Sequence, residues 1–234
     1  MRKVFNVSAA CRPDLHYMVN IGEKLQIIKK MVDQGQYFTI NRARQYGKTT
    51  ILHALENLLK KEYVVISLDF QMFSTADFRT EQDFMETFST EILTMDTGRY
   101  PIPAQIKEQF ENFTSRTNSN SRLSMLFRCL SHWCRLSDQK IVMLIDEADS
   151  ACEQQIFLDF LAQLRGYYIT RDKKPALHSV ILAGVYDMKN LKSKITDEHR
   201  MNSPWNIAAD FDVDMSLSKQ GIEGNYRSCF IIKN

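Results

Sequence analysis

The sequence predicts an α/β fold built on a mostly parallel β-sheet. Three apolar runs, at residues 63–70, 141–145 and 179–184, are nearly continuous, as expected of strands that are buried on both faces. Segments with apolar residues at helical spacing separate these runs. Because strands and helices alternate along the chain, we expect a three-layer α/β/α arrangement with helices on both faces of the sheet.

The individual elements follow from the same two periodicities. Helices are predicted where apolar residues recur every three or four positions: 21–32, 49–59, 84–93, 106–113, 123–133 and 157–164. Strands are predicted from short β-prone runs: 37–40, 63–70, 141–145, 179–184 and, as a further candidate, part of 205–217. The polar stretches 114–122 and 170–179 are expected to be loops.

Composition places the chain among ordinary soluble globular proteins. Of its 234 residues, 44% are apolar and 25% are charged, and 30 basic residues nearly balance 28 acidic ones. A formal net charge of +2 gives no overall electrostatic signature for nucleic acid.

The cysteines and the terminus predict a cellular location. The chain has five scattered cysteines, an odd number that argues against a disulfide framework. The first residues lack the apolar core of a signal peptide, and no run approaches the roughly 20 apolar residues of a membrane span. We therefore expect a cytoplasmic protein without a membrane segment.

The stretch INRARQYGKTTILHAL, residues 40–55, resembles a phosphate-binding loop between a strand and a helix. The consensus is G-x-x-x-x-G-K-[ST], and Arg42 holds the place of its first glycine. In such a loop, backbone N–H groups and the helix N-terminus surround a phosphate. Lys48 would reach the β- and γ-phosphates, and Thr49 would coordinate Mg²⁺. The residues predicted to contact the nucleotide are Arg42, Ala43, Arg44, Gln45, Tyr46, Gly47, Lys48, Thr49 and Thr50.

A second motif, IVMLIDEAD, supplies the acids that such a site requires. Asp146 and Glu147 follow a buried strand, and ligands of open α/β sheets bind at the carboxyl ends of strands. We expect Asp146 to hold Mg²⁺ and Glu147 to act as general base toward the attacking water, with Lys48 stabilising the charge of the transferred phosphate. Two motifs of matching type predict a site for ATP and Mg²⁺, whereas acids that only cap the next helix would leave the first motif unexplained.

Together with SVILAGVYDMKNL and SPWNIAADFDVDMSLS, these motifs make the chain similar to the predicted AAA-type ATPase-like proteins of bacteria. That family has an R-x-R-x-[FY]-G-K-[ST] loop, which accounts for Arg42 and Arg44. The resemblance implies a P-loop NTPase fold of the additional-strand, catalytic-glutamate type, with strand order 5-1-4-3-2. It also implies a sensor near Tyr186 or Asp187.

By this resemblance the chain divides into three parts. Residues 1–36 would be an N-terminal extension and a helix packed on the core, and residues 37–218 would be the P-loop ATPase core. Residues 219–234 would form an irregular tail in place of the family's helical lid. We accordingly expect slow hydrolysis by the isolated chain, and a homo-oligomer or a partner that supplies a lid or an arginine remains open.

Two other patterns in the sequence suggest different functions. The tetrapeptide DEAD at residues 146–149 also occurs in helicases, but the chain is too short for two helicase domains. Cys129, His132 and Cys134 are close in sequence, yet positions i and i+5 do not share a helical face, so a metal site is not expected. A nucleotide-binding switch with little hydrolysis, and a non-catalytic truncated remnant, remain as alternative functions.

Overall fold

The computed structural model describes residues 4, 15–17, 20–41, 47–95, 100–115, 121–185 and 204–214. Its sheet has four parallel strands in the order β1-β4-β3-β2. The strands are β1 Tyr37–Asn41, β2 Val64–Asp69, β3 Ile141–Asp146 and β4 Ser179–Gly184. The predicted α/β fold with a parallel sheet is confirmed, and the order is consistent with a P-loop NTPase core.

The helices begin and end within a few residues of the predicted positions. They are α1 Gly22–Asp33, α2 Lys48–Leu59, α3 Glu81–Thr94, α4 Ala104–Thr114, α5 Leu123–Leu136 and α6 Gln155–Ile169. Three short 3₁₀ helices lie between them: η1 Phe70–Met72, η2 Thr75–Phe78 and η3 Ala148–Ala151. In the part of the chain described here, no helix is long and apolar enough to cross a membrane.

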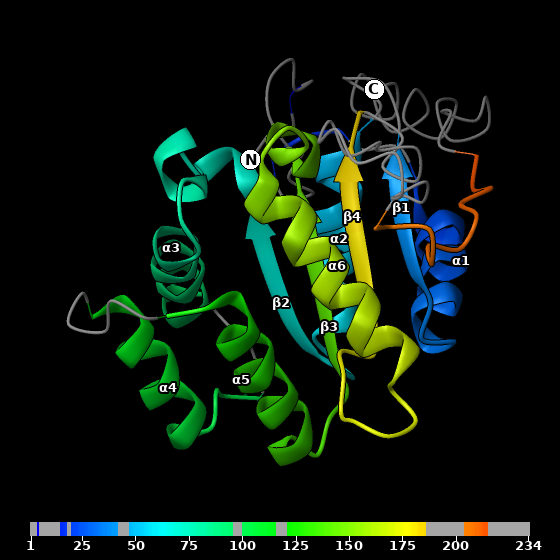
Figure 1. Cartoon of the computed structure of the whole chain (residues 1–234). Coiled ribbons are helices and arrows are strands. Elements are labelled where there is room, and N and C mark those ends of the chain that lie inside the picture. The colour runs from blue at the N-terminus through cyan, green and yellow to red at the C-terminus, as the bar shows by residue number, and fades with distance from the viewer. Residues whose placement is uncertain are drawn as a thin grey trace, which may run out of the picture.

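The helices cover both faces of the sheet (Figure 1). On one face α1 and α2 pack against side chains such as Phe38, Ile40 and Leu144. On the other face α3, α5 and α6 pack against the alternate side chains, such as Tyr37 and Met143. Because successive strand residues point to opposite faces, each strand contributes to both cores, and the layers are α/β/α.

The segment predicted to hold the fifth strand lies beside β1 but forms one bridge instead of a ladder. Ala209 pairs with Phe38 in parallel, and its N–H donates to the Tyr37 carbonyl at 2.7 Å. Trp205 is fully buried, stacks on Tyr37, and donates from Nε1 to Thr39 Oγ1 at 2.8 Å. Within the described residues, one backbone bridge and the packing of Trp205 therefore hold this segment against β1.

An aromatic cluster fixes the chain just beyond the carboxyl end of β2. Phe70 is fully buried and contacts the rings of Phe84, Phe157 and Phe160 at centroid distances of 5.7–6.5 Å. Aromatic pairs at such distances stabilise beyond the area they bury. The cluster ties η1 to α3 and α6, and so holds Asp69, the residue before Phe70.

Several predictions fall on residues outside the described part. These are the loop positions Arg42, Ala43, Arg44, Gln45 and Tyr46, the sensor candidates Tyr186 and Asp187, and the tail 219–234. The division of the chain at residues 36 and 218 likewise stays a prediction.

Candidate functional site

The beginning of α2 is built as an anion site requires. Gly47 precedes the helix in a left-handed conformation, with φ 73° and ψ 22°. A Cβ at this position would meet no atom within 4 Å, so the requirement for glycine comes from the backbone and not from lack of space. Within the described part of the chain no side chain caps α2, and its first turn contains no acidic residue. The positive end of the helix dipole is therefore available to an anion.

Lys48 is the first residue of α2 and is 6% exposed. Thr49 and Thr50 complete the first turn and are half-buried. Few lysines are buried this deeply, because burial of an ammonium group costs free energy unless a charged partner is present.

Asp146 and Glu147 stand where β3 ends. Asp146 is the last residue of the strand, and its Oδ1 accepts a hydrogen bond from the Glu147 N–H at 2.9 Å. Its other oxygen, Oδ2, accepts none from the described residues. A hydroxyl at Thr49 and a carboxylate oxygen at Asp146 are hard oxygen ligands of the kind Mg²⁺ takes, so the residues present fit that ion.

Glu147 has a backbone conformation that is unusual for its residue type. Its φ is 48°, and it is the one described non-glycine residue with positive φ. Packing and one hydrogen bond hold the turn after it. Ala148 and Ala151 are fully buried, and Ser150 Oγ donates to the Phe70 carbonyl at 3.2 Å. Strain of this kind costs on the order of 1–3 kcal/mol and is concentrated at functional sites.

The pKa of Glu147 shows which charged side chains lie near its carboxyl group. Burial raises the pKa of Glu147, and the negative charges of Asp146, Asp149 and Asp69 raise it further. The positive charge of Lys48 acts in the opposite direction and lowers this pKa. The two motifs, about 100 residues apart in the sequence, therefore lie within electrostatic range of each other.

Asp69 and Asp149, two of the acids near Glu147, were not predicted from the sequence as site residues. Asp69 ends β2 and is the register partner of Asp146 on β3, and its side chain caps η1 by accepting from the Gln71 N–H at 2.9 Å. Asp149 has a buried oxygen, Oδ1, with no hydrogen-bond partner among the described residues. An acid at the end of the apolar run 63–70 was the available signal for Asp69, because strand ends of a parallel sheet meet at one edge.

The residues 14–215 match the family model described as AAA-like domain. The chain belongs to the AAA-like domain family. This accounts for the combination of a parallel sheet, a G-K-T sequence at the beginning of α2 and acids at the end of β3. It also confirms the kind of family that the sequence resemblance indicated, whereas the bacterial origin, the R-x-R loop pattern and the truncation were expectations that it does not address.

Solved structures show the same fold at low sequence identity. The Walker-type ATPase of Pyrococcus abyssi matches with a TM-score of 0.56 and 17% identity over 96% of this chain. The ORC1 protein of Aeropyrum pernix, solved in complex with DNA, matches with a TM-score of 0.51 and 8% identity over 90% of this chain. The chain spans 62% and 50% of the length of these two proteins. No curated protein matches the chain.

Proposed function

We propose that this chain binds ATP with Mg²⁺ and hydrolyses the bond between the β- and γ-phosphates. The observation that carries the proposal is the convergence of Lys48, at the uncapped beginning of α2, with Asp146 and Glu147 at the end of β3. Family membership and the ATPase among the structural neighbours support it.

Each residue has a role that follows from its place. The N–H groups at the beginning of α2 and the ammonium group of Lys48 would bind the β- and γ-phosphates. Arg42, Ala43, Arg44, Gln45 and Tyr46 would complete the loop around the phosphates. Thr49 and Asp146 would hold Mg²⁺, which when bound neutralises charge on the phosphates.

Glu147 would orient the attacking water and take its proton. A general base works best when its pKa lies near the working pH, and burial together with neighbouring acids moves the pKa of Glu147 upward, toward that range. The left-handed backbone at Glu147 would hold this carboxylate in one direction, so less reorganisation is needed when the water is activated.

Calorimetric titration with ATP and with a non-hydrolysable analogue, each with and without Mg²⁺, tests binding. A phosphate-release assay on the same samples tests hydrolysis. Magnesium-dependent binding with phosphate release supports the proposal, whereas binding without release would identify a nucleotide-binding switch. Absence of binding would overturn the proposal and favour a non-catalytic remnant.

A pair of variants separates the two acids. Glu147→Gln should bind ATP and lose turnover, and Asp146→Asn should weaken the magnesium dependence of binding. Glu108→Gln, an exposed acid on α4, is the matched control for removal of one carboxylate. Identical behaviour of the first two variants in both assays would contradict the assigned roles.

A further inference from the structure

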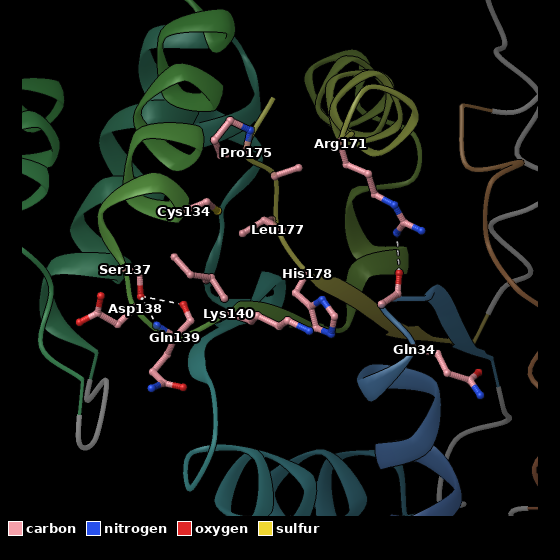
Figure 2. Close-up of a pocket in the computed structure, with 13 residues that line it drawn as sticks. Gln34, Cys134, Ser137, Asp138, Gln139, Lys140, Arg171, Pro175, Leu177 and His178 are labelled. Atoms are coloured by element: carbon pink, nitrogen blue, oxygen red, sulfur yellow. Dashed lines mark hydrogen bonds between the residues drawn. The ribbon is translucent and has the colours of Figure 1, made fainter. Parts of the chain in front are cut away.

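A cavity lies beside Ile141, at the beginning of β3, whereas Glu147 follows the other end of that strand. Figure 2 shows the residues that line it. It has a volume of about 420 Å³, within the range of sites for small ligands. Its walls come from the end of α1, the end of α5 and the loop from α6 to β4, and Ile141 at the beginning of β3 lines it too. No residue assigned to the nucleotide site lines it.

Two cations, Arg171 and Lys140, line this cavity, and neither has a carboxylate partner among the described residues. Arg171 is fixed in place: its Nη1 donates to the Gly35 carbonyl at 2.8 Å, and its guanidinium lies 4.1 Å from the centre of the Tyr168 ring. A guanidinium has five N–H donors, so most of its donors remain available to a ligand. In the described part of the chain neither Arg171 nor Lys140 makes an ion pair.

Lys140 and Arg171 both act on His178, the residue before β4. The pKa of His178 is lowered, first by burial and then by the charge of Lys140. The backbone of Asp33 and Val32 raises this pKa, and Arg171 makes the smallest contribution, which lowers it. Figure 2 shows the Lys140 side chain directed toward His178, and the Arg171 guanidinium directed toward the Gly35 carbonyl. Three groups that carry or accept positive charge therefore share one wall of the cavity.

The acids near this wall are few. Asp138 lines the cavity and is exposed. Asp33, on α1, is engaged elsewhere, because it accepts from Lys29 Nζ at 2.9 Å and from the Tyr63 hydroxyl at 2.7 Å. Asp33 still acts on this wall at a distance, because the charge of His178 contributes to the lowered pKa of Asp33.

The ends of α1, α5 and α6 meet at the cavity, and helix C-termini favour cations over anions. Carbonyls at these ends already accept hydrogen bonds from the chain itself, as in Gly35 N–H to Val32, Ser137 N–H to Trp133 and Thr170 N–H to Gly166. Arg171 takes the Gly35 carbonyl as well. Carbonyls of the helix ends thus lie beside the two cations of the wall, and the backbone of Val32 and Asp33 acts on His178 as well.

We propose that this cavity binds a small molecule through a phosphate group, which Arg171 and Lys140 hold beside His178. The planar fork of arginine matches two phosphate oxygens, and lysine adds a point charge from a second direction. Gln34 and Gln139 line the same cavity and add polar groups to it, and Gln34 Oε1 already accepts from Gln36 Nε2 at 3.0 Å. The site is separate from the proposed ATPase site and does not depend on it.

The imidazole of His178 provides a local reporter of binding by NMR. The full chain carrying Lys48→Ala, in which the phosphate loop is disabled, is titrated with inorganic phosphate and with pyrophosphate at constant ionic strength. Loss of one imidazole signal in His178→Gln assigns the resonance. We expect the His178 signal to shift with saturation and its pKa to rise, because a bound anion offsets the charges of Lys140 and Arg171.

Variants of the wall then test the assignment. Lys140→Met and Arg171→Met should each raise the dissociation constant about tenfold or more, and Arg171→Lys should lie between Arg171→Met and the parent. Lys173→Met removes an exposed cation from the same loop outside the cavity and should change nothing. Thermal melts of all variants identify any that fail to fold, and Arg171→Lys keeps the charge if Arg171→Met is lost.

Three outcomes would overturn the proposal. The first is a His178 signal that neither phosphate nor pyrophosphate moves. The second is a shift of the same size from sodium chloride or in the Lys140→Met and Arg171→Met variants, which would mean screening alone. The third is a shift caused by a short DNA duplex and not by pyrophosphate, which would assign this wall to a nucleic-acid surface.

Discussion

Among the described residues, acids gather at the carboxyl end of the sheet and two cations at its amino end. At the carboxyl end, burial and three neighbouring acids raise the pKa of Glu147, and the buried Lys48 lowers it. At the amino end, Lys140 and Arg171 face His178, whose pKa is lowered. In both places like charges are held together by the fold, so a ligand of the opposite charge would relieve repulsion at either end. At the carboxyl end that ligand would be a metal ion with its phosphates, and at the amino end a phosphate alone.

The ends differ in backbone strain as well. Left-handed conformations occur at Gly47 and Glu147 at the carboxyl end, and at Gly35 at the amino end. The two glycines adopt this conformation at little cost, whereas Glu147 does not. A strained non-glycine residue among the acids is the stronger indication of catalysis, because packing around η3 must hold it there.

The largest expected effect belongs to the carboxyl end. Glu147→Gln should lower ATP turnover about 10²–10⁴-fold, because it removes the general base and retains the shape of the side chain. The dissociation constant of ATP should change little. Phosphate release and calorimetry measure the two quantities, and Glu108→Gln serves as control. Full turnover in Glu147→Gln would leave the carboxyl end without its proposed base.

The next effect concerns binding. Lys48→Ala should raise the dissociation constant of ATP roughly 10–100-fold, as expected for the loss of a charge-assisted hydrogen bond to phosphate. Phosphate binding at His178 should remain as in the parent chain. Calorimetry measures the dissociation constant of ATP, and NMR measures phosphate binding at His178. If Lys48→Ala abolished the response of His178, the two ends would not be independent sites.

A third prediction compares two glycines. Gly47→Ala should destabilise the chain by about 1–2 kcal/mol, because a side chain disfavours the left-handed conformation at this position. Gly166 lies inside α6, and a Cβ there would also meet no atom within 4 Å. Gly166→Ala should therefore stabilise the chain by about 0.5–1 kcal/mol. Urea denaturation gives both values, and effects of equal sign would show that strain at Gly47 does not decide its identity.

The smallest effects are in the dependence of stability on pH. Because the folded pKa of Glu147 is raised, its favourable contribution is complete below the unfolded value near 4.5 and is lost as pH rises through the folded pKa. Glu147→Gln, which does not titrate, should gain stability relative to the parent as pH rises above 4.5. Denaturant titrations between about pH 4 and pH 8 measure this difference. That range includes the unfolded pKa of a glutamate and that of a histidine.

The contribution of His178 to stability should change with pH in the opposite direction. Its folded pKa is lowered, so its favourable contribution is present above the unfolded value near 6.5 and is lost as pH falls through the folded pKa. Relative to the parent, His178→Gln should therefore be least stable near neutral pH and should recover as pH falls below 6.5. The same denaturant titrations measure it. Parallel pH profiles for His178→Gln and Glu147→Gln would contradict the opposite polarity of the two ends.

The sequence alone determined the features that are written into single segments. The alternation of apolar strands with amphipathic helices predicted the α/β fold and nearly every element, because burial of one face imposes a period on each segment. Two local motifs, the G-K-T sequence before a helix and the acids after a buried strand, predicted the positions of Lys48, Thr49, Asp146 and Glu147. Each of these motifs requires only its immediate neighbours in the chain.

Tertiary structure decided what segments far apart in the sequence do together. Asp69 joins Asp146 only because β2 pairs with β3, and Arg171 meets the Gly35 carbonyl only because the loop after α6 turns back to the end of α1. The predicted fifth strand is held chiefly by Trp205, since the fit of one indole against β1 is not visible in a pattern of alternation. The left-handed Glu147 likewise depends on the packing of η3 against Phe70. Periodicity reports which face of a segment is buried, whereas strand order and packing decide which residues meet there.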